Sequence, residues 1–227
     1  MTALIFDTET TGGEPPRMIE AAGIFMNEGN EVDLRPAADF SERFNPGVPS
    51  TLGALATHHI LDSDLEGCPS PEEFNLKLGE EDYLIGHNVD YDWKMIGSPP
   101  VRRICTLALA RRALPTLESH TLGALAYHFL GGEQARDMLR GKAHGAAVDC
   151  EVTRHVLRHL IPFFKVAGAP FTWEALWCAS EFSRVPSVMP FGKHKGTAIR
   201  DLPGDYVDWM LRQSDIDEYL RKALVSR

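Results

Sequence analysis

The segment LIFDTETTGG at residues 4–13 is the feature that most constrains the fold. Its apolar run ends directly on Asp7, and Glu9 follows two residues later. In a β-strand, residues i and i+2 lie on the same face, so both carboxylates would point the same way. Like charges this close repel and raise each other's pKa. A buried strand with this ending therefore predicts a compensating partner, and a divalent metal ion is the first candidate.

The rest of the chain alternates between strand-like and helix-like segments. We predict strands at residues 3–7, 19–28, 31–35 and 83–88, and a further strand that ends at residue 105. The second and third strands would form a hairpin through the Gly-Asn pair at 29–30. We predict helices at residues 50–57, 71–79, 89–96, 106–114, 119–131, 145–160 and 172–183. A hairpin followed by alternating strands and helices favours an α/β fold with a mixed sheet flanked by helices. Functional sites in such folds gather at strand tips.

A change in composition predicts a boundary after the first 160 residues. Pro162, Gly168 and Pro170 interrupt the regular pattern there. We therefore predict a domain at 1–165, a linker with a short helix at 166–185 and a small, mainly helical C-terminal module at 186–227.

Charge and cysteine content exclude several classes of protein. The net charge of −9 argues against binding nucleic acid by bulk charge, although a local basic groove or a metal site would reverse the field locally. The four cysteines form no CxxC pair, so we expect reduced thiols. No apolar run approaches 18 residues and no signal peptide is evident. We expect a soluble, cytoplasmic protein without a membrane partner; the sequence leaves its oligomeric state open.

Two further segments add candidate ligands. GHNVDYDW at 86–93 offers Asp90 and Asp92 after a predicted strand, and HGAAVD at 144–149 offers His144 and Asp149. Five residues along a helix leave two side chains about 140° apart, so this histidine must lie on the loop before the helix to converge with the acid. Carboxylate oxygens suit Mg²⁺ or Mn²⁺, and a histidine can act as a general base.

These three segments, in this order, resemble the three motifs of the DEDDh exonuclease superfamily over residues 3–160. The second motif is usually His-Asn-x-x-Phe-Asp, which makes Asp92 the ligand and puts Tyr91 in place of Phe. Asp90 is then an acid at the start of a helix, where it complements the helix dipole. The resemblance implies an RNase H-like fold and a 3′→5′ exonuclease that releases 5′-mononucleotides from DNA.

The resemblance also implies roles for individual residues. Two Mg²⁺ or Mn²⁺ ions would share Asp7, with Glu9 and Asp149 completing one metal site and Asp92 supporting the other. His144 would remove the proton of the attacking water. The substrate-binding residues would be Thr8, Thr10, Thr11, Gly12, His87 and Asn88, and for the last two a structural role around the strand tip is the alternative.

The tail FGKHKGTAIRDLPGDYVDWMLR resembles the C-terminal module of exonuclease X-type members of the superfamily. GKHKGT at 192–197 lacks the spacing of a phosphate-binding loop. It is either an exposed turn or a basic contact to a nucleic-acid backbone. We expect Trp173, Trp177 and Trp209 to pack the small C-terminal core.

Three functions remain after this reading. The first is a DNA exonuclease in repair, acting on 3′ ends, with single-stranded and duplex substrates both open. The second is an exonuclease that trims RNA, because the motifs do not separate the two sugars. The third is a nucleic-acid-binding protein without catalysis.

Overall fold

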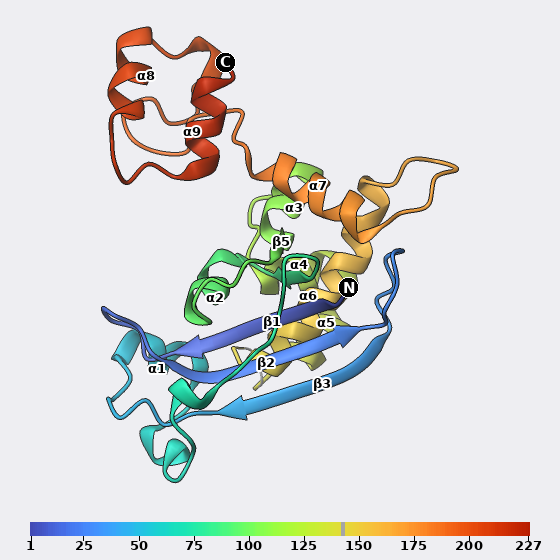
Figure 1. Cartoon of the computed structure of the whole chain (residues 1–227), viewed down its shortest axis with the longest axis vertical. Helices are drawn as coiled ribbons and strands as arrows, with labels where there is room; N and C mark the ends of the chain where they lie inside the picture. The colour runs from blue at the N-terminus through green and yellow to red at the C-terminus, as the bar shows by residue number, and fades with distance from the viewer. Residues whose placement is uncertain (142–143) are drawn as a thin grey trace. The chain divides into compact units, whose positions relative to one another are not determined.

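The computed structural model describes residues 1–141 and 144–227. This described chain divides into two compact units, Met1–Ser180 and Glu181–Arg227. Each unit is described by itself. Figure 1 shows the first unit as a sheet with helices and the second, orange to red, as a small helical body.

A mixed five-stranded sheet is the centre of the first unit. Its strands are β1 Ala3–Thr10, β2 Met18–Met26, β3 Pro36–Arg43, β4 Tyr83–Gly86 and β5 Arg102–Cys105. They lie in the order β3-β2-β1-β4-β5. β2 is antiparallel to both β1 and β3, whereas β4 is parallel to β1 and β5. The predicted mixed α/β sheet is confirmed, and β1, with its two acids, is the central strand.

The first unit also contains helices. They are α1 Leu52–His58, α2 Asp90–Met95, α3 Thr106–Ala113, α4 Leu122–Leu130, α5 Gly132–Leu139, α6 Ala146–Leu160 and α7 Trp173–Arg184, the last of which continues into the second unit. Thr121 is the N-cap of α4, where its hydroxyl accepts a hydrogen bond from the Ala124 N–H. We did not predict α5 as a separate helix. In the part of the chain described here, no helix is long and apolar enough to cross a membrane.

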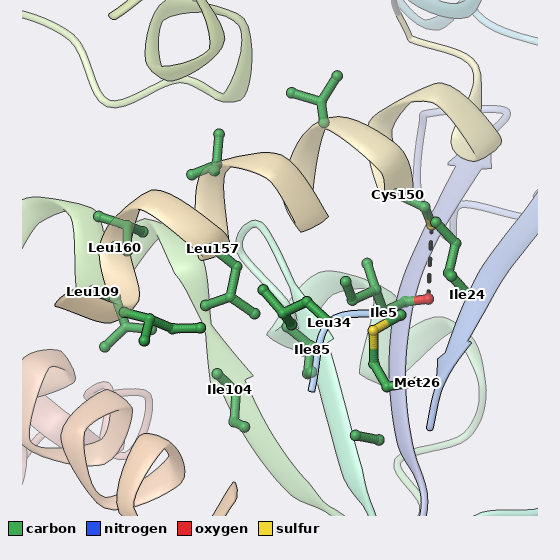
Figure 2. Packing of buried hydrophobic residues seen from close by; sticks show 14 of the residues in the cluster. Ile5, Ile24, Met26, Leu34, Ile85, Ile104, Leu109, Cys150, Leu157 and Leu160 are labelled. Atoms are coloured by element: carbon green, nitrogen blue, oxygen red, sulfur yellow. Dashed lines mark hydrogen bonds between the residues drawn. The ribbon is translucent and has the colours of Figure 1, made fainter. Parts of the chain in front are cut away.

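The main core lies between the sheet and α6. Leu157 and Leu160 of α6 are fully buried, as are Ile5 of β1, Ile85 of β4 and Ile104 of β5. Figure 2 shows α6 passing over these strands, with Leu157 and Cys150 on the side that faces them. Full burial of one such side chain contributes about 1.5–3 kcal/mol. Near the start of α6, Cys150 is also fully buried and its thiol donates to the Ala22 carbonyl at 3.3 Å, which holds this end of the helix against the sheet.

Two predicted elements are wrong. Residues 31–35 are not a strand, because Asp33 there binds Arg35 and Asn27 with its carboxylate and closes a turn; the third strand begins at Pro36. Residues 71–79 contain only a 3₁₀ turn, Pro71–Glu73. The following Phe74, Leu76 and Leu78 pack against a second core cluster at every other position, which is the spacing of an extended chain.

The segment predicted as a linker belongs partly to the first unit. Trp173 and Leu176 of α7 are buried in the main core, and Trp177 packs against it. Trp173 and Trp177 therefore do not pack the C-terminal core, contrary to our prediction. Residues 173–180 extend the first unit beyond the predicted boundary at 165.

The second unit is small and mainly helical, as predicted. It contains a 3₁₀ turn, Ile199–Asp201, followed by α8 Gly204–Leu211 and α9 Glu218–Val225. The Asp217 side chain caps α9 by accepting hydrogen bonds from the Tyr219 and Leu220 N–H groups. Its own core contains Met189, Ile199, Leu202, Val207, Met210, Leu220, Ala223 and Leu224.

Candidate active site

Three carboxylates converge at the carboxyl end of β1. Asp7 and Glu9 leave the same face of this strand, and Asp149 comes from the first turn of α6. One carboxylate oxygen from each of the three lies within 4.8 Å of the others. The convergence follows from the fold, because α6 packs across β1 and β2 and brings its N-terminal turn to the strand end.

Asp92 completes the set of acids from a different element. It lies in α2, is 4% exposed, and its Oδ1 accepts hydrogen bonds from the Thr8 N–H at 2.9 Å and the Thr8 hydroxyl at 2.7 Å. Thr8 stands between Asp7 and Glu9 on β1, so α2 is attached directly to the strand that carries the other acids. Asp92 is not in the three-carboxylate group, but its charge raises the pKa of Asp7.

Burial and mutual repulsion dominate the electrostatics of the acids Asp7, Glu9 and Asp92. Burial raises the pKa of Asp7 well above its usual range, and the charges of Asp92, Asp149 and Glu9 add to this. Burial raises the pKa of Glu9 to about 8, and repulsion by the charges of Asp149, Glu20 and Asp92 adds to this shift. Burial also raises the pKa of Asp92 to about 6, although the two hydrogen bonds from Thr8 oppose the shift.

The donor set fits a divalent metal ion. All donors are carboxylate oxygens, which suit hard cations such as Mg²⁺ or Mn²⁺. A bound cation would favour the ionised form of Asp7 and Glu9 and so remove the conflict that raises their pKa values. A bound cation therefore explains how a buried strand can end on two acids.

His144 lies beside Asp149, in the turn before α6. Its φ of +62° is in the left-handed region, and α6 begins two residues later at Ala146. Burial raises the pKa of Asp149, whereas the charge of His144 and a backbone hydrogen bond from it lower that pKa. The predicted arrangement, with the histidine on the loop and the acid inside the helix, is confirmed. The imidazole is exposed, which leaves it accessible to a water molecule or a substrate.

The threonines after the first acid are engaged within the protein through their side chains. The Thr10 hydroxyl is 2.7 Å from the Tyr91 hydroxyl, and the Thr11 hydroxyl donates to the Gly12 carbonyl. Gly12 has a φ of +64°, and a Cβ there would lie 2.6 Å from Oγ1 of Thr51. These contacts hold the β1–β2 loop in one conformation. Its main chain is engaged as well, because the Thr11 N–H donates to the Arg17 carbonyl and the Thr11 carbonyl accepts from the Thr51 N–H, both at 2.8 Å.

Residues at the tip of β4 have mainly structural contacts. His87 Nδ1 is 3.0 Å from the Thr106 hydroxyl, and its Nε2 is 2.9 Å from the His120 carbonyl oxygen. Burial lowers the pKa of His87 to about 4, so the ring is neutral at pH 7. Both nitrogens are engaged, which favours the structural role over a substrate contact. Asn88 is exposed with a φ of +73°, a conformation that asparagine tolerates in turns.

The acid that is not a predicted ligand lies outside the cluster. Asp90 is the first residue of α2, and its carboxylate binds the Arg103 guanidinium at 2.5 Å. This agrees with our interpretation of Asp90 as an acid at a helix start.

We did not predict the role of Glu20. It pairs with Glu9 across β1 and β2, is 6% exposed, and accepts a hydrogen bond from the Arg43 Nε at 3.1 Å. Its other oxygen accepts from the Ala146 N–H at 2.8 Å, at the first residue of α6. Glu20 thus fastens the start of the helix that carries Asp149 to the sheet. The one available signal was a charged residue in an otherwise uncharged strand.

Comparison with known proteins places this site in a family. A family model described as exonuclease matches residues 4–157. Exodeoxyribonuclease 10 of Escherichia coli strain K12 is 27% identical over 218 residues, which cover 93% of this chain and 91% of that protein. The PolC-type DNA polymerase III of Halalkalibacterium halodurans is 30% identical over 174 residues, 70% of this chain but 11% of the polymerase.

Solved structures show the same fold. Exonuclease X in complex with 5′-overhanging duplex DNA has a TM-score of 0.59 at 23% identity, covering 78% of this chain and 99% of that one. The complex of Escherichia coli ExoI with single-stranded DNA has a TM-score of 0.53 at 17% identity, covering 72% of this chain and 42% of that one. A second family model, described as a putative quorum-sensing-regulated virulence factor, matches residues 182–215.

The fold and the four acids define an exonuclease domain of the DEDDh type, on an RNase H-like sheet. The chain belongs to the exonuclease family and resembles exonuclease X over most of its length.

Proposed function

We propose that this protein is a divalent-metal-dependent 3′→5′ exonuclease that releases 5′-mononucleotides from DNA, with DNA repair as its setting. The observation that carries the proposal is the convergence of Asp7, Glu9 and Asp149 within 4.8 Å. The 27% identity to an exodeoxyribonuclease over nearly the whole chain supports DNA as the substrate. The cytoplasmic location expected from the sequence stays a prediction.

The carboxylates would hold the cations, preferably Mg²⁺ or Mn²⁺ and two per site. Asp7 is the proposed shared ligand, because it belongs to the group with Glu9 and Asp149 and the charge of Asp92 also raises its pKa. Bound divalent cations supply charge stabilisation to the attacking and leaving oxygens of a phosphodiester. Thr8 fixes the Asp92 carboxylate with two hydrogen bonds, so that this acid keeps its position when a substrate arrives.

His144 is the proposed general base. Its exposed ring lies next to Asp149, whose negative charge stabilises the imidazolium formed when the ring accepts a proton from water. The oxygen of that water forms a bond to the terminal phosphorus, and the bond from phosphorus to the O3′ of the preceding nucleotide breaks. The products are a 5′-mononucleotide and a strand that is one nucleotide shorter. The main-chain groups around Thr8 to Gly12 would hold the terminal nucleotide.

The test uses 5′-labelled DNA and RNA oligonucleotides with Mg²⁺ or with EDTA. The proposal predicts a ladder that shortens from the 3′ end in Mg²⁺ and is lost in EDTA. Asp149→Ala should abolish the ladder while the protein stays folded. Asp90→Asn is the matched control, because this acid lies in the same motif as Asp92 but pairs with Arg103 instead; it should retain activity.

The two alternatives have separate outcomes in this experiment. Faster shortening of RNA than of DNA would replace the DNA assignment by an RNA-trimming one. No shortening of either polymer by folded protein would refute the catalytic proposal in favour of a binding protein.

A further inference from the structure

The second unit has a group of aromatic side chains that are partly or largely exposed. We give the name aromatic face to the contacting rings of His194, Tyr206 and Trp209 together with Phe191, which precedes the loop that carries His194. Trp209 is 49% exposed and Phe191 is 51% exposed, whereas His194 and Tyr206 are half-buried. Our expectation that Trp209 packs the C-terminal core is therefore wrong.

Three of these rings form a row. The centroids of His194 and Tyr206 are 4.4 Å apart, and those of Tyr206 and Trp209 are 5.6 Å apart. Tyr206 and Trp209 are three residues apart on α8, so they lie on one side of this helix. The partly buried Tyr206 packs against the core of the unit and anchors the row, while Trp209 leaves ring surface in contact with solvent.

The loop that carries His194 is closed by main-chain hydrogen bonds. The Met189 N–H donates to the Thr197 carbonyl, and the Gly196 N–H donates back to the Met189 carbonyl, both at 2.8 Å. Within the loop, the Lys195 N–H donates to the Gly192 carbonyl at 3.1 Å. The loop thus has a defined conformation before any ligand binds, which lowers the entropic cost of binding.

Two lysines give this face a positive border. Lys193 and Lys195 flank His194, and both are exposed. Residues 181–227 contain eight Lys and Arg and seven Asp and Glu, so this unit is nearly neutral, whereas the whole chain has a net charge of −9. The nearest acids on α8, Asp205 and Asp208, each precede a ring by one residue and therefore point about 100° away from it.

We propose that the aromatic face binds single-stranded nucleic acid. Bases would stack on Trp209 and the neighbouring rings, and Lys193 and Lys195 would contact the phosphates. Exposed aromatic rings beside ammonium groups are the combination that binds single strands without reading their sequence. The site lies in a different unit from the carboxylate cluster, so it would add a second contact to the polymer besides the one at its 3′ end.

The experiment measures binding of the full chain to a fluorescein-labelled 20-nucleotide oligothymidine by anisotropy, in EDTA so that hydrolysis does not interfere. Trp209→Ala should weaken the affinity at least about fivefold, since one stacked base contributes about 1–3 kcal/mol. Trp209→Phe should stay within about twofold of the parent, because it keeps an aromatic surface. Phe163→Ala is the matched control, since this phenylalanine is 54% exposed in the first unit; its affinity should be unchanged.

A second measurement tests the lysines independently of the folding of the tryptophan variants. Replacing both Lys193 and Lys195 by Ala should reduce the slope of log affinity against log salt by about 1.4, since each lost phosphate contact on a single strand removes about 0.7. Lys222→Ala, an exposed lysine on α9 of the same unit, should leave the slope unchanged.

Parent-like affinity for Trp209→Ala together with a parent-like salt slope for the double lysine variant would overturn the proposal. Binding of an oligoglutamate peptide, in place of oligothymidine, with the same dependence on these residues would also overturn it and indicate an acidic protein partner. The catalytic proposal is tested separately, because Asp149→Ala should lose hydrolysis but retain the dependence of binding on Trp209.

Discussion

The stability of the metal-free protein should fall as the pH rises from 7 to 8. The pKa of Glu9 is raised from its ordinary 4.5 to about 8, so the folded protein keeps a proton that the unfolded chain releases. The resulting stabilisation is fully present below pH 4.5 and is lost as the pH rises through 8. Each retained proton changes the free energy of unfolding by about 1.4 kcal/mol per pH unit.

The magnitude follows from how much of the proton remains bound. Between pH 7 and 8 the folded Glu9 holds on average about three quarters of a proton, which gives a loss of about 1 kcal/mol. Asp7, whose pKa is also raised, would add to this loss. His87 contributes little in this window, because its pKa is lowered from 6.5 to about 4 and most of its effect falls below pH 7. A loss of 1 kcal/mol lowers the melting temperature of a chain of this length by about 2–4 °C.

Metal binding should cancel this dependence. Carboxylates must release their protons to bind a cation, so saturating Mg²⁺ should stabilise the protein more at pH 8 than at pH 7, by about the same 1 kcal/mol. The assay is urea unfolding at both pH values with Mg²⁺ and with EDTA, beside Glu9→Gln, which removes the titrating group. Equal metal-free stability at both pH values, or an unchanged slope in Glu9→Gln, would refute the reasoning.

Three further substitutions test other parts of the structure. Glu20→Ala should leave the Ala146 N–H without an acceptor, which should destabilise the protein by about 1–3 kcal/mol and lower kcat at least about tenfold. Glu20→Gln should recover part of the stability and part of the rate in unfolding and kinetic measurements, and equal kcat in the two variants would contradict this. Gly12→Ala should lower the free energy of unfolding in urea more than Gly13→Ala does. Both glycines have a positive φ, but only at Gly12 would a Cβ lie 2.6 Å from another side-chain atom. Equal losses of unfolding free energy in the two variants would count against this clash. Leu157→Ala should cost about 2–5 kcal/mol, against less than about 0.5 kcal/mol for the exposed Leu52→Ala.

Sequence patterns predicted the elements whose burial is regular. The apolar stripe of α6 recurs every three to four residues, and the short strand β4 is an uninterrupted buried run, so both elements were found. β3 was missed because nearly all its side chains are exposed. It is a strand because it pairs with β2 along its length, and that pairing leaves no trace in its own sequence.

The candidate site was predictable to the level of residue types and their order. The resemblance to the three motifs pointed to Asp7, Glu9, Asp92 and Asp149. Their convergence required in addition that α2 and the first turn of α6 lie at the end of β1. The supporting contacts were not predictable, because they depend on register. Glu20 reaches the start of α6 only since β2 pairs with β1 in a particular alignment, and Thr8 reaches Asp92 only once α2 lies against β1.

The most direct test of the account is hydrolysis of single-stranded DNA in ¹⁸O-labelled water with Mg²⁺, followed by mass spectrometry of the first product. The account predicts the 3′-terminal nucleotide as a 5′-monophosphate with one ¹⁸O on its phosphate, and a shortened strand with an unlabelled 3′ hydroxyl. Release of 3′-monophosphates, release from the 5′ end, or the same product from Asp7→Asn would contradict it.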